Sequence, residues 1–364
     1  MTNGSPRSSR AMILERPGAF REQSIPLPDI GHDEFLLRVE LVTICGGDII
    51  EFQGGNRKAR YPLLMGHELV GRIEQIGEGA SERHGVAVAD RVMVEPYLRC
   101  GQCGPCIAGN YHFCVQGATY GVTIPSTRPP HLWGAYSQYL YGAPGARVHK
   151  ISEEVPAAAA CLTTVVANGL RWVRTRGRAY LGEGALITGL GVQALSSVLV
   201  AELAGLSPIV VVCRERDERR LQLARTLGAD RIVNTAELDS AAVRQELRDL
   251  GFTLAVECTG AEPMFALAVD VLAPLGRLVA VGTRGGQPLP LDLDALVFKE
   301  ITVVGGLGQA LDTEMAATIV NANKLPIADM VSHTMPLTAA QKAIELCLEG
   351  HEDVIHVSLD PWAD

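Results

Sequence analysis

The sequence predicts an α/β plus β fold, in which a doubly wound parallel sheet is inserted between two parts of a β-rich domain. The first 150 residues contain short runs of alternating apolar side chains, such as Glu34–Ile44, separated by Gly, Pro and Asp. From about Ala157, apolar strand-like runs alternate with helix-length segments, which is typical of parallel βαβ units. Past Gly308 the chain returns to short strands such as His356–Asp360, and we expect this end to rejoin the first part. The predicted parts follow the order of the chain: residues 1–161, 162–307 and 308–364.

The composition is that of a soluble globular protein with room for two domains. Of 364 residues, 47% are hydrophobic and 20% are charged. The net charge of −9 argues against nucleic acid and against anionic membranes as partners. The start of the chain lacks the apolar core of a signal peptide, and nine cysteines without an export signal favour the reducing cytoplasm. The longest apolar run, residues 184–206, contains polar side chains and a Gly-x-Gly turn, so it predicts a strand, a turn and a buried helix.

The stretch Thr43–Phe52, TICGGDIIEF, raises the first question about function. It places Cys45 in a small Gly-rich turn, with Asp48 three residues further on. His67 and Glu68 follow side by side in GHELVG, and His67 comes 22 residues after Cys45. A thiolate and an imidazole are ligand types that zinc binds, so Cys45 is a candidate for one part of a metal site.

A lobe of four cysteines predicts a second metal site. The segment CGQCGPCIAGNYHFC has the spacing C-x2-C-x2-C-x7-C, in which short spacers let neighbouring thiolates face one centre. Four thiolates leave no open coordination position, so the zinc held there would be structural, and iron–sulfur runs use other spacings. His112 lies inside the lobe, and we expect it to pack or to face solvent. The expected ligands are the four sulfurs of Cys100, Cys103, Cys106 and Cys114.

The run GALITGLGVQALSSVLVAELAG predicts a dinucleotide-binding turn between a strand and a helix. It contains G-x-G-x-x-A at Gly189, Gly191 and Ala194. The first glycine permits a tight turn, the second lets the backbone approach a pyrophosphate, and the small third residue lets the helix pack on the sheet. The pattern alone is weak, but here a strand precedes it and a second strand, PIVVVC, follows the helix.

The end of that second strand should distinguish NAD from NADP. An acidic residue there binds the ribose 2′-hydroxyl, whereas an arginine accommodates a 2′-phosphate. Counting forward from Gly205 puts Cys213 at this position with Arg214 after it, whereas counting back from LGAD puts Glu215 there. The two counts disagree, and the flanking arginines Arg214 and Arg216 favour NADP slightly.

Together these motifs resemble the zinc-dependent medium-chain dehydrogenase/reductase family of the alcohol dehydrogenase-like type. The resemblance covers nearly the whole chain and is carried by ICGGD, GHELVGRI, DRVMVEP, the cysteine lobe, GLGVQA, VECTG and GRLVAVGT. One departure is Ala89, which stands where the family usually has glycine before DRV. The resemblance implies a GroES-like catalytic domain made from both ends of the chain, with a Rossmann domain between them and the active site in the cleft.

The resemblance also implies roles for individual residues. Cys45 and His67 match the first two ligands of a catalytic zinc, and Cys161 in AAAACLTT matches the third. Glu68 matches an acid that can approach the metal, and Asp48 matches a carboxylate that orients the ligating histidine. Thr259 and Gly282 match residues that touch the cofactor. Without the family, Cys161 reads as a core cysteine, Glu68 as a surface acid, and Thr259 and Gly282 as turn residues.

The chain departs from the family pattern where a proton relay is usual. The residue two after the first cysteine is usually Ser or Thr, and a histidine often lies three further on. Here these positions are Gly47 and Ile50, and neither side chain can carry a proton. Three explanations stay open: water or another hydroxyl such as Thr43 or Thr164 replaces the relay, the hydride chemistry does not begin with an alcohol, or activity is lost or altered.

The sequence therefore predicts a zinc-dependent and NAD(P)-dependent oxidoreductase of the class EC 1.1.1.-, which interconverts an alcohol and a ketone or aldehyde. We expect two zinc ions per chain, one catalytic and one structural, and a small-molecule substrate whose identity the sequence does not give. The first alternative is an NADPH-dependent reductase of a conjugated C=C or C=N bond. The second is a non-catalytic NADP-binding protein. By resemblance, we expect a homodimer or homotetramer.

Overall fold

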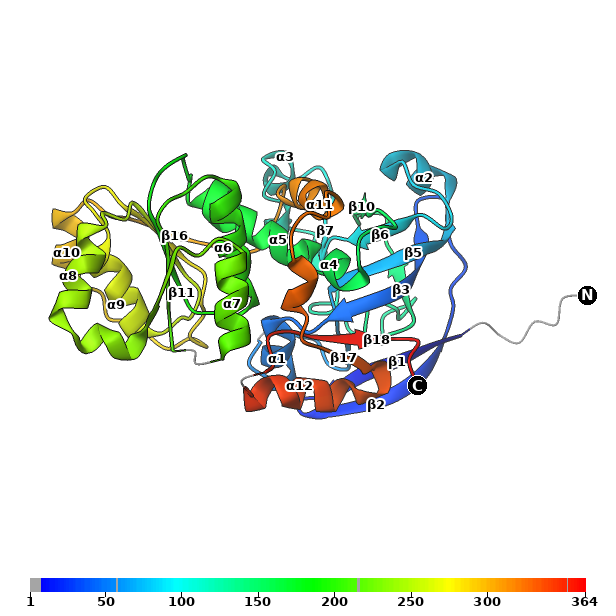
Figure 1. Cartoon of the computed structure of the whole chain (residues 1–364). Coiled ribbons are helices and arrows are strands. Elements are labelled where there is room, and N and C mark those ends of the chain that lie inside the picture. The colour runs from blue at the N-terminus through cyan, green and yellow to red at the C-terminus, as the bar shows by residue number, and fades with distance from the viewer. Residues whose placement is uncertain (1–7, 57, 215–216, 352) are drawn as a thin grey trace, which may run out of the picture. The chain divides into compact units, whose positions relative to one another are not determined.

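The computed structural model describes residues 8–56, 58–214, 217–351 and 353–364. The chain divides into two compact units (Figure 1). Unit 1 is built from the residues up to 164 together with 313–364, and unit 2 from residues 165–312. The domain limits predicted from the sequence, after residues 161 and 307, stay a prediction.

Unit 1 contains the β-rich part of the chain. A seven-stranded sheet has the order β10-β6-β5-β3-β18-β17, with β9 also paired to β3. A three-stranded sheet has the order β2-β1-β4, and β7 pairs with β8. The strands of unit 1 are β1 (Ser8–Arg16), β2 (Ala19–Pro26), β3 (Phe35–Thr43), β4 (Leu63–Leu64), β5 (Glu68–Ile76), β6 (Arg91–Val94), β7 (Tyr97–Leu98), β8 (Ala118–Thr119), β9 (Tyr139–Gly142), β10 (Val148–Lys150), β17 (His333–Pro336) and β18 (Val357–Asp360).

The C-terminal segment rejoins this sheet, as the sequence predicts. β18 lies antiparallel to β3, and Ser358 is opposite Thr43 in the register. The backbone N–H of Ile44 also donates to the carbonyl of Val357 at 2.9 Å. Because β3 ends at Thr43, this pairing brings the residues before β18 next to the turn that contains Cys45.

The helices of unit 1 are short and connect or cover the strands. α12 packs against α1 and β18, and a 3₁₀ turn at Tyr111–Phe113 follows α3. The helices that lie wholly in unit 1 are α1 (Gly46–Phe52), α2 (Glu78–His84), α3 (Gly104–Ile107), α4 (Ala157–Cys161), α11 (Thr313–Asn321) and α12 (Ala340–Glu349).

Unit 2 is a doubly wound parallel sheet with the order β13-β12-β11-β14-β15-β16. α6 and α7 lie on one side of the sheet, and α8, α9 and α10 lie on the other (Figure 1). The chain enters the unit along α5 (Thr163–Leu170). The other elements are β11 (Ala185–Thr188), α6 (Val192–Leu203), β12 (Ile209–Cys213), α7 (Glu218–Thr226), β13 (Arg231–Asn234), α8 (Ala241–Asp249), β14 (Leu254–Glu257), α9 (Glu262–Val271), β15 (Arg277–Ala280), α10 (Leu293–Phe298) and β16 (Thr302–Gly305).

The central strand of this sheet is β11, which has β12 on one side and β14 on the other. All four residues of β11 are buried, because helices cover both faces of a parallel sheet. The long apolar run 184–206 is therefore a strand, a Gly-rich turn and the mostly buried helix α6, as predicted. The strand order reverses at β11, and in open parallel sheets ligands bind at such switch points. Within the described residues, no helix is both long enough and apolar enough to cross a membrane.

Candidate active site

The thiol of Cys45 is positioned by the first turn of α1. Cys45 is the N-cap residue of this helix, and its Sγ accepts a hydrogen bond from the backbone N–H of Gly47 at 3.5 Å. In return, the carboxylate of Asp48 accepts from the backbone N–H of Cys45 at 3.0 Å. This reciprocal capping box satisfies helix donors that would otherwise lack partners, and it fixes the thiol beside the helix N-terminus.

His67 lies directly before β5 and follows Gly66, a glycine that no other residue can replace without strain. Gly66 has φ +92°, and a Cβ at this position would lie 2.5 Å from Cδ1 of Tyr136. The imidazole Nδ1 of His67 is 3.7 Å from Oδ1 of Asp48, while the hydroxyl of Tyr136 donates to Oδ2 at 3.1 Å. Asp48 therefore lies beside the ring, where a carboxylate can orient a ligating imidazole.

Glu68 is the first residue of β5, and its carboxylate is buried. Its Oε2 accepts a hydrogen bond from the hydroxyl of Thr43 at 2.9 Å and lies 3.3 Å from Nε2 of His356. Glu68 is thus not the surface acid that its sequence alone suggests, since only 1% of the residue is exposed. Potential ligand atoms of Cys45, His67 and Glu68 all lie within 4.8 Å of one another, so the three residues could hold a metal ion.

The electrostatics of this group suit a cation. Burial and the charges of Glu68 and Asp48 raise the pKa of the Cys45 thiol well above its usual range. Burial also raises the pKa of Asp48 to about 7. Burial alone would raise the pKa of Glu68, but the hydrogen bond and charge of His356 bring it below the usual range. Among the described residues, Asp48 Oδ1 and His67 Nδ1 are buried without hydrogen-bond partners. A divalent cation would stabilise the thiolate and the carboxylates together, so the donor set fits the predicted zinc.

Cys161 lies at the end of α4 and is not brought into this three-residue group. Its thiol donates to the backbone carbonyl of Glu68 at 3.0 Å and lies 3.8 Å from the hydroxyl of Thr43. The sulfur is therefore close to the first residue of β5 but is bonded to its backbone. The role of Cys161 as third ligand stays a prediction, and it requires the thiol to leave this hydrogen bond.

The buried residues Tyr136, His356 and Glu51 belong to the site but were not singled out from the sequence. His356 precedes β18 and reaches Glu68 from 288 positions away, so its role depends on strand pairing that no local spacing reveals. Glu51 lies on α1 four residues after Gly47, a spacing that places two residues on the same helix face. That spacing was the available signal for Glu51.

The four predicted lobe cysteines lie together around α3 and the following 3₁₀ turn. Their sulfurs all lie within 4.8 Å of one another, with Cys100 Sγ 3.9 Å from Cys106 Sγ and Cys103 Sγ 3.8 Å from Cys114 Sγ. The backbone N–H groups of Val115 and Cys106 lower the pKa of the Cys103 thiol to about 6. This cluster could hold a metal ion, and His112 is outside it, with its ring against Phe113.

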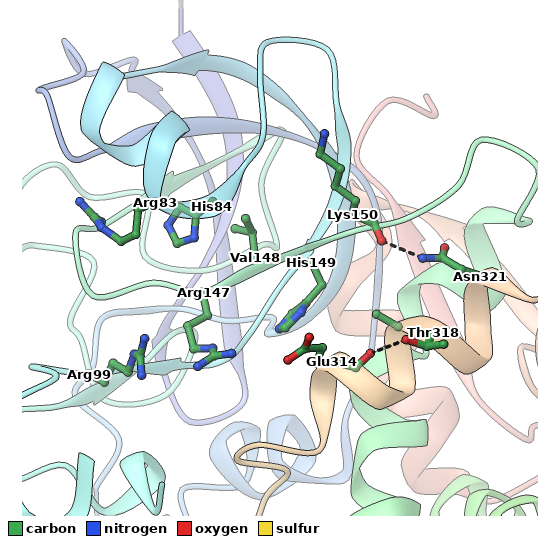
Figure 2. Close-up of a pocket in the computed structure, with 11 residues that line it drawn as sticks. Arg83, His84, Arg99, Arg147, Val148, His149, Lys150, Glu314, Thr318 and Asn321 are labelled. Carbon is green, nitrogen blue, oxygen red and sulfur yellow. Dashed lines mark hydrogen bonds between the residues drawn. The ribbon is translucent and has the colours of Figure 1, made fainter. Parts of the chain in front are cut away.

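A cavity of about 500 Å³ also opens in unit 1, between β10 and α11 (Figure 2). Cationic side chains dominate its lining: Arg83, Arg99, Arg147 and Lys150. Three of these cations face acids, in the pairs Arg83–Asp33, Arg147–Glu95 and Lys150–Asp90. Arg99 lies over the ring of Tyr111. Since the candidate metal ligands do not line this cavity and its charges are mostly paired, we do not assign the active site to it.

The predicted dinucleotide turn lies at the carboxyl end of β11. Gly189 has φ +91°, and Gly191 is the N-cap residue of α6, so backbone N–H groups of the first helical turn face the end of the sheet. Ala194 is fully buried where the helix packs on the sheet. Helix N-termini of this kind favour a pyrophosphate. Cofactor contacts by these residues stay a prediction.

The residues expected to select NAD or NADP follow β12. Cys213 is the last residue of this strand and is buried, whereas Arg214 directly after it is exposed. Glu215 lies outside the described residues. The position of the exposed arginine agrees with the forward count from Gly205, but the choice between the cofactors stays a prediction.

Thr259 and Gly282 lie at the carboxyl ends of β14 and β15. The backbone N–H of Thr259 donates to Oε1 of Glu257 at 2.8 Å, and the hydroxyl of Thr188 donates to the same oxygen at 3.1 Å. A Cβ on Gly282 would lie 1.9 Å from the backbone nitrogen of Gly260. Both predicted cofactor residues therefore also have a packing role. Glu257 joins the ends of β11 and β14, and the sequence did not single it out.

Comparison with known proteins matches both parts of the chain. The family model described as "Alcohol dehydrogenase GroES-like domain" matches residues 31–153, and "Zinc-binding dehydrogenase" matches residues 194–322. A Mycobacterium tuberculosis protein named "Probable alcohol dehydrogenase adh" is 33% identical over 97% of this chain and 98% of its own. The erythritol/L-threitol dehydrogenase of Mycolicibacterium smegmatis is 30% identical over 99% and 100%. The crystal structure of a Thermotoga maritima alcohol dehydrogenase has the same fold, with a TM-score of 0.88 at 23% identity over 97% of this chain and 99% of that one.

Proposed function

Because the chain belongs to the zinc-type, alcohol dehydrogenase-like family of medium-chain dehydrogenases/reductases, we propose that it is an NAD(P)-dependent enzyme that interconverts an alcohol and a ketone or aldehyde. The chain has the family's GroES-like part and its parallel Rossmann-like sheet, and it is an oxidoreductase of this type. The specific reaction, the two zinc ions and the cofactor are our proposal.

The observation that carries the proposal is the group formed by the partly buried Cys45 and His67 and the buried Glu68. Its ligand atoms lie together although the residues come from two separate segments, and Asp48 is placed beside the imidazole. A zinc ion bound there would supply Lewis acidity at the substrate oxygen, and the nicotinamide would exchange hydride with the adjacent carbon. Within the chain, Asp48 and Tyr136 hold the imidazole side of the site, while Thr43 and His356 hold Glu68 in place.

For the cofactor we propose the Gly189–Gly191 turn as the pyrophosphate site, because the turn lies at the switch point of the sheet and opens α6. The slight preference for NADP rests on the exposed Arg214 directly after β12. A comparison of the dissociation constants for NADH and NADPH, in the wild type and in Arg214→Ala, tests it. Loss of affinity for NADPH alone supports the preference, and equal or tighter binding of NADH by the wild type overturns it.

The second candidate function is reduction of a conjugated C=C or C=N bond, favoured by the absence of a hydroxyl at Gly47 and of a histidine at Ile50. Assays of a panel of alcohols, ketones and enones with both cofactors separate the two reactions. Turnover of enones but of no alcohol or ketone would replace the first proposal. Absence of turnover with every compound would favour the non-catalytic NADP-binding protein.

The decisive experiment measures zinc per chain in protein purified without chelator, for the wild type, Cys45→Ala and the control Cys347→Ala. Cys347 lies on α12 outside both groups of candidate ligands. We expect two zinc ions in the wild type and in the control and one in Cys45→Ala. One zinc ion in all three proteins would mean that only the cysteine lobe is filled, and the proposed catalytic zinc would be wrong.

A further inference from the structure

Gly47 has no side-chain hydroxyl, and the residue one helical turn further along α1 is Glu51. Residues four apart lie on the same face of a helix, and helical side chains tilt towards the N-terminus. Glu51 therefore extends along α1 over Gly47, towards the turn that holds Cys45. Only 2% of Glu51 is exposed, although it is an acidic residue on a short helix.

The carboxylate of Glu51 is held at one oxygen and open at the other. Oε1 accepts a hydrogen bond from Nδ2 of Asn56 at 2.5 Å. Oε2 is buried and has no hydrogen-bond partner among the described residues. A buried polar atom without a partner is costly and is usually explained by a bound group or by function.

The space left by Gly47 connects this open oxygen with the metal-ligand group. A Cβ built at Gly47 would lie 3.7 Å from Oε2 of Glu51 and 3.8 Å from Sγ of Cys45. It would also lie 4.0 Å from Cε1 of His67. These are ordinary contact distances, so the volume of a small side chain is open between the carboxylate and two candidate ligands. A water molecule in this space would have polar neighbours on both sides.

Titratable neighbours adjust the acidity of Glu51. Burial, followed by the negative charge of Asp48, raises the pKa of Glu51 to about 7, while Asn56 and His67 act in the opposite direction. The hydroxyl of Tyr61 donates to the backbone carbonyl of Glu51, not to its carboxylate. From α12, which packs on α1, the thiol of Cys347 interacts with Asp48. A proton acceptor works best when its pKa is close to the working pH.

We propose that Glu51 is the proton acceptor of the alcohol reaction and replaces the hydroxyl relay of the family pattern, with one water at Gly47 as the connection. The inference rests on the proposed function. In oxidation, the substrate O–H bond breaks and its proton passes through this water to Oε2 of Glu51. The C–H electron pair would leave as hydride to a bound nicotinamide, and the C=O bond would form. The neutral carboxylic acid then returns the proton to solvent past Asn56, which is only partly buried. Reduction runs the same transfers in reverse.

The test compares Glu51→Gln with the wild type and with Glu82→Gln, the same substitution at an exposed position of another short helix. Glutamine keeps the size of the side chain but accepts no proton at this pH. We expect kcat for alcohol oxidation near neutral pH to fall about 10²- to 10⁴-fold in Glu51→Gln. The loss should shrink at alkaline pH and on addition of a small carboxylate base such as formate. Zinc content and NAD(P)H affinity should stay unchanged, and Glu82→Gln should match the wild type.

A second readout needs no turnover. Infrared difference spectra of the zinc-loaded protein, recorded from acid to alkaline pH, should contain a protonated-carboxyl band that is present in the wild type and in Glu82→Gln but absent in Glu51→Gln. If Glu51→Gln binds two zinc ions and keeps the wild-type kcat and pH profile, the proton-acceptor role is wrong. If the wild type converts no alcohol or ketone, the proposed function fails instead, and the infrared titration still reports whether Glu51 takes up a proton. Absence of the band would also overturn the inference.

Discussion

At the scale of single residues, the turn TICGGDIIEF contains the candidate metal ligand Cys45 and, one helical turn after Gly47, the proposed proton acceptor Glu51. If Glu51 replaces the family relay, restoring that relay should compensate for its loss. We expect Gly47→Ser and Ile50→His, added to Glu51→Gln, to recover at least about tenfold in kcat, a part of the usual gain from proton transfer. A Cβ at Gly47 meets no atom closer than 3.7 Å, and Ile50 is 40% exposed, so both side chains have room. A triple variant that binds zinc but is no faster than Glu51→Gln would contradict this expectation.

The pair of Glu68 and His356 makes a second prediction at this scale. Glu68 is 1% exposed and His356 is 5% exposed, and the two side chains are 3.3 Å apart. Replacing His356 by leucine leaves the buried carboxylate with the hydroxyl of Thr43 as its remaining side-chain donor. We expect His356→Leu to lower the free energy of unfolding by roughly 1–3 kcal/mol, the cost of a buried acceptor that loses a partner. Urea unfolding of the zinc-loaded protein measures it, with the partly buried His333→Leu as the control. Equal stability of wild type and His356→Leu would show that this contact does not hold Glu68.

These residues also mark what could be predicted from the sequence. The cysteine lobe and the Gly-x-Gly turn follow from local spacing, because each motif acts within one turn or loop. The ligand role of Cys45 is instead implied by the resemblance to the family. Tyr136 and His356 reach the site from 88 and 288 positions along the chain, through hydrogen bonds to Asp48 and Glu68. Such contacts depend on strand register and on the return of the C-terminus, which single-sequence patterns do not specify. The position of Glu51 beside Gly47 could have been predicted, because residues four apart lie on the same face of a helix.

At the scale of elements, Glu95 ties the cysteine lobe to the sheet. It follows β6 and accepts hydrogen bonds from the hydroxyl of Tyr111 in the lobe at 2.6 Å and from Arg147 at 3.0 Å. It also lies 2.7 Å from the ring of His149 on β10. Burial alone would raise the pKa of Glu95, but His149 and Arg147 bring it below the usual 4.5. The lobe is therefore fixed by charge as well as by any bound metal.

This network makes a pH-dependent prediction. Because the folded-state pKa of Glu95 is lowered, its contribution to stability is fully present above the unfolded pKa and is lost as the pH falls through the folded pKa. We expect Glu95→Gln to lower the free energy of unfolding by roughly 3 kcal/mol at neutral pH, and the difference from wild type to shrink below about pH 4. Urea unfolding across this range measures it. Asp90→Asn, which breaks a more exposed pair with Lys150, should cost at most about 1 kcal/mol. A Glu95→Gln deficit that is independent of pH would contradict the charge argument.

The loops after β14 and β15 form a second element whose packing is tight. Since a Cβ on Gly282 would lie 1.9 Å from the backbone nitrogen of Gly260, Gly282→Ala must displace one of the two loops. We expect a loss of about 1–3 kcal/mol in the stability of unit 2 and weaker NAD(P)H binding, because the loops lie at the carboxyl end of the sheet. Gly305→Ala on β16 is the matched control, since a Cβ there meets nothing within 4 Å. Fluorescence titration of NAD(P)H and thermal unfolding of both variants test it, and identical behaviour would contradict the packing argument.

At the scale of the whole molecule, the open edge of the parallel sheet bears on assembly. β16 is the outermost strand in the order β13-β12-β11-β14-β15-β16, so its outer backbone groups have no strand partner in that sheet. Apolar side chains on and near this edge are exposed, including Val303 on β16 at 42% and Phe298 on α10 at 84%. An exposed apolar edge strand can pair with a strand of another chain, so proteins that do not aggregate usually have such edges covered.

We expect a second copy of the chain to cover this edge. A twofold axis would place the two β16 strands antiparallel and continue one sheet through both subunits, which is a closed and self-complementary contact. The homodimer would then have twice the chain mass of 38.9 kDa. A lysine at Val303 would put a charge in the centre of the contact, so Val303→Lys should shift the protein to monomers. Val88→Lys, at a more exposed valine of unit 1, should not. Light scattering after size exclusion measures the mass of each protein. A monomeric wild type would show that this edge is not an interface. A Val303→Lys variant that keeps the wild-type mass would show the same, because a charge buried without a partner costs several kcal/mol and would separate the subunits.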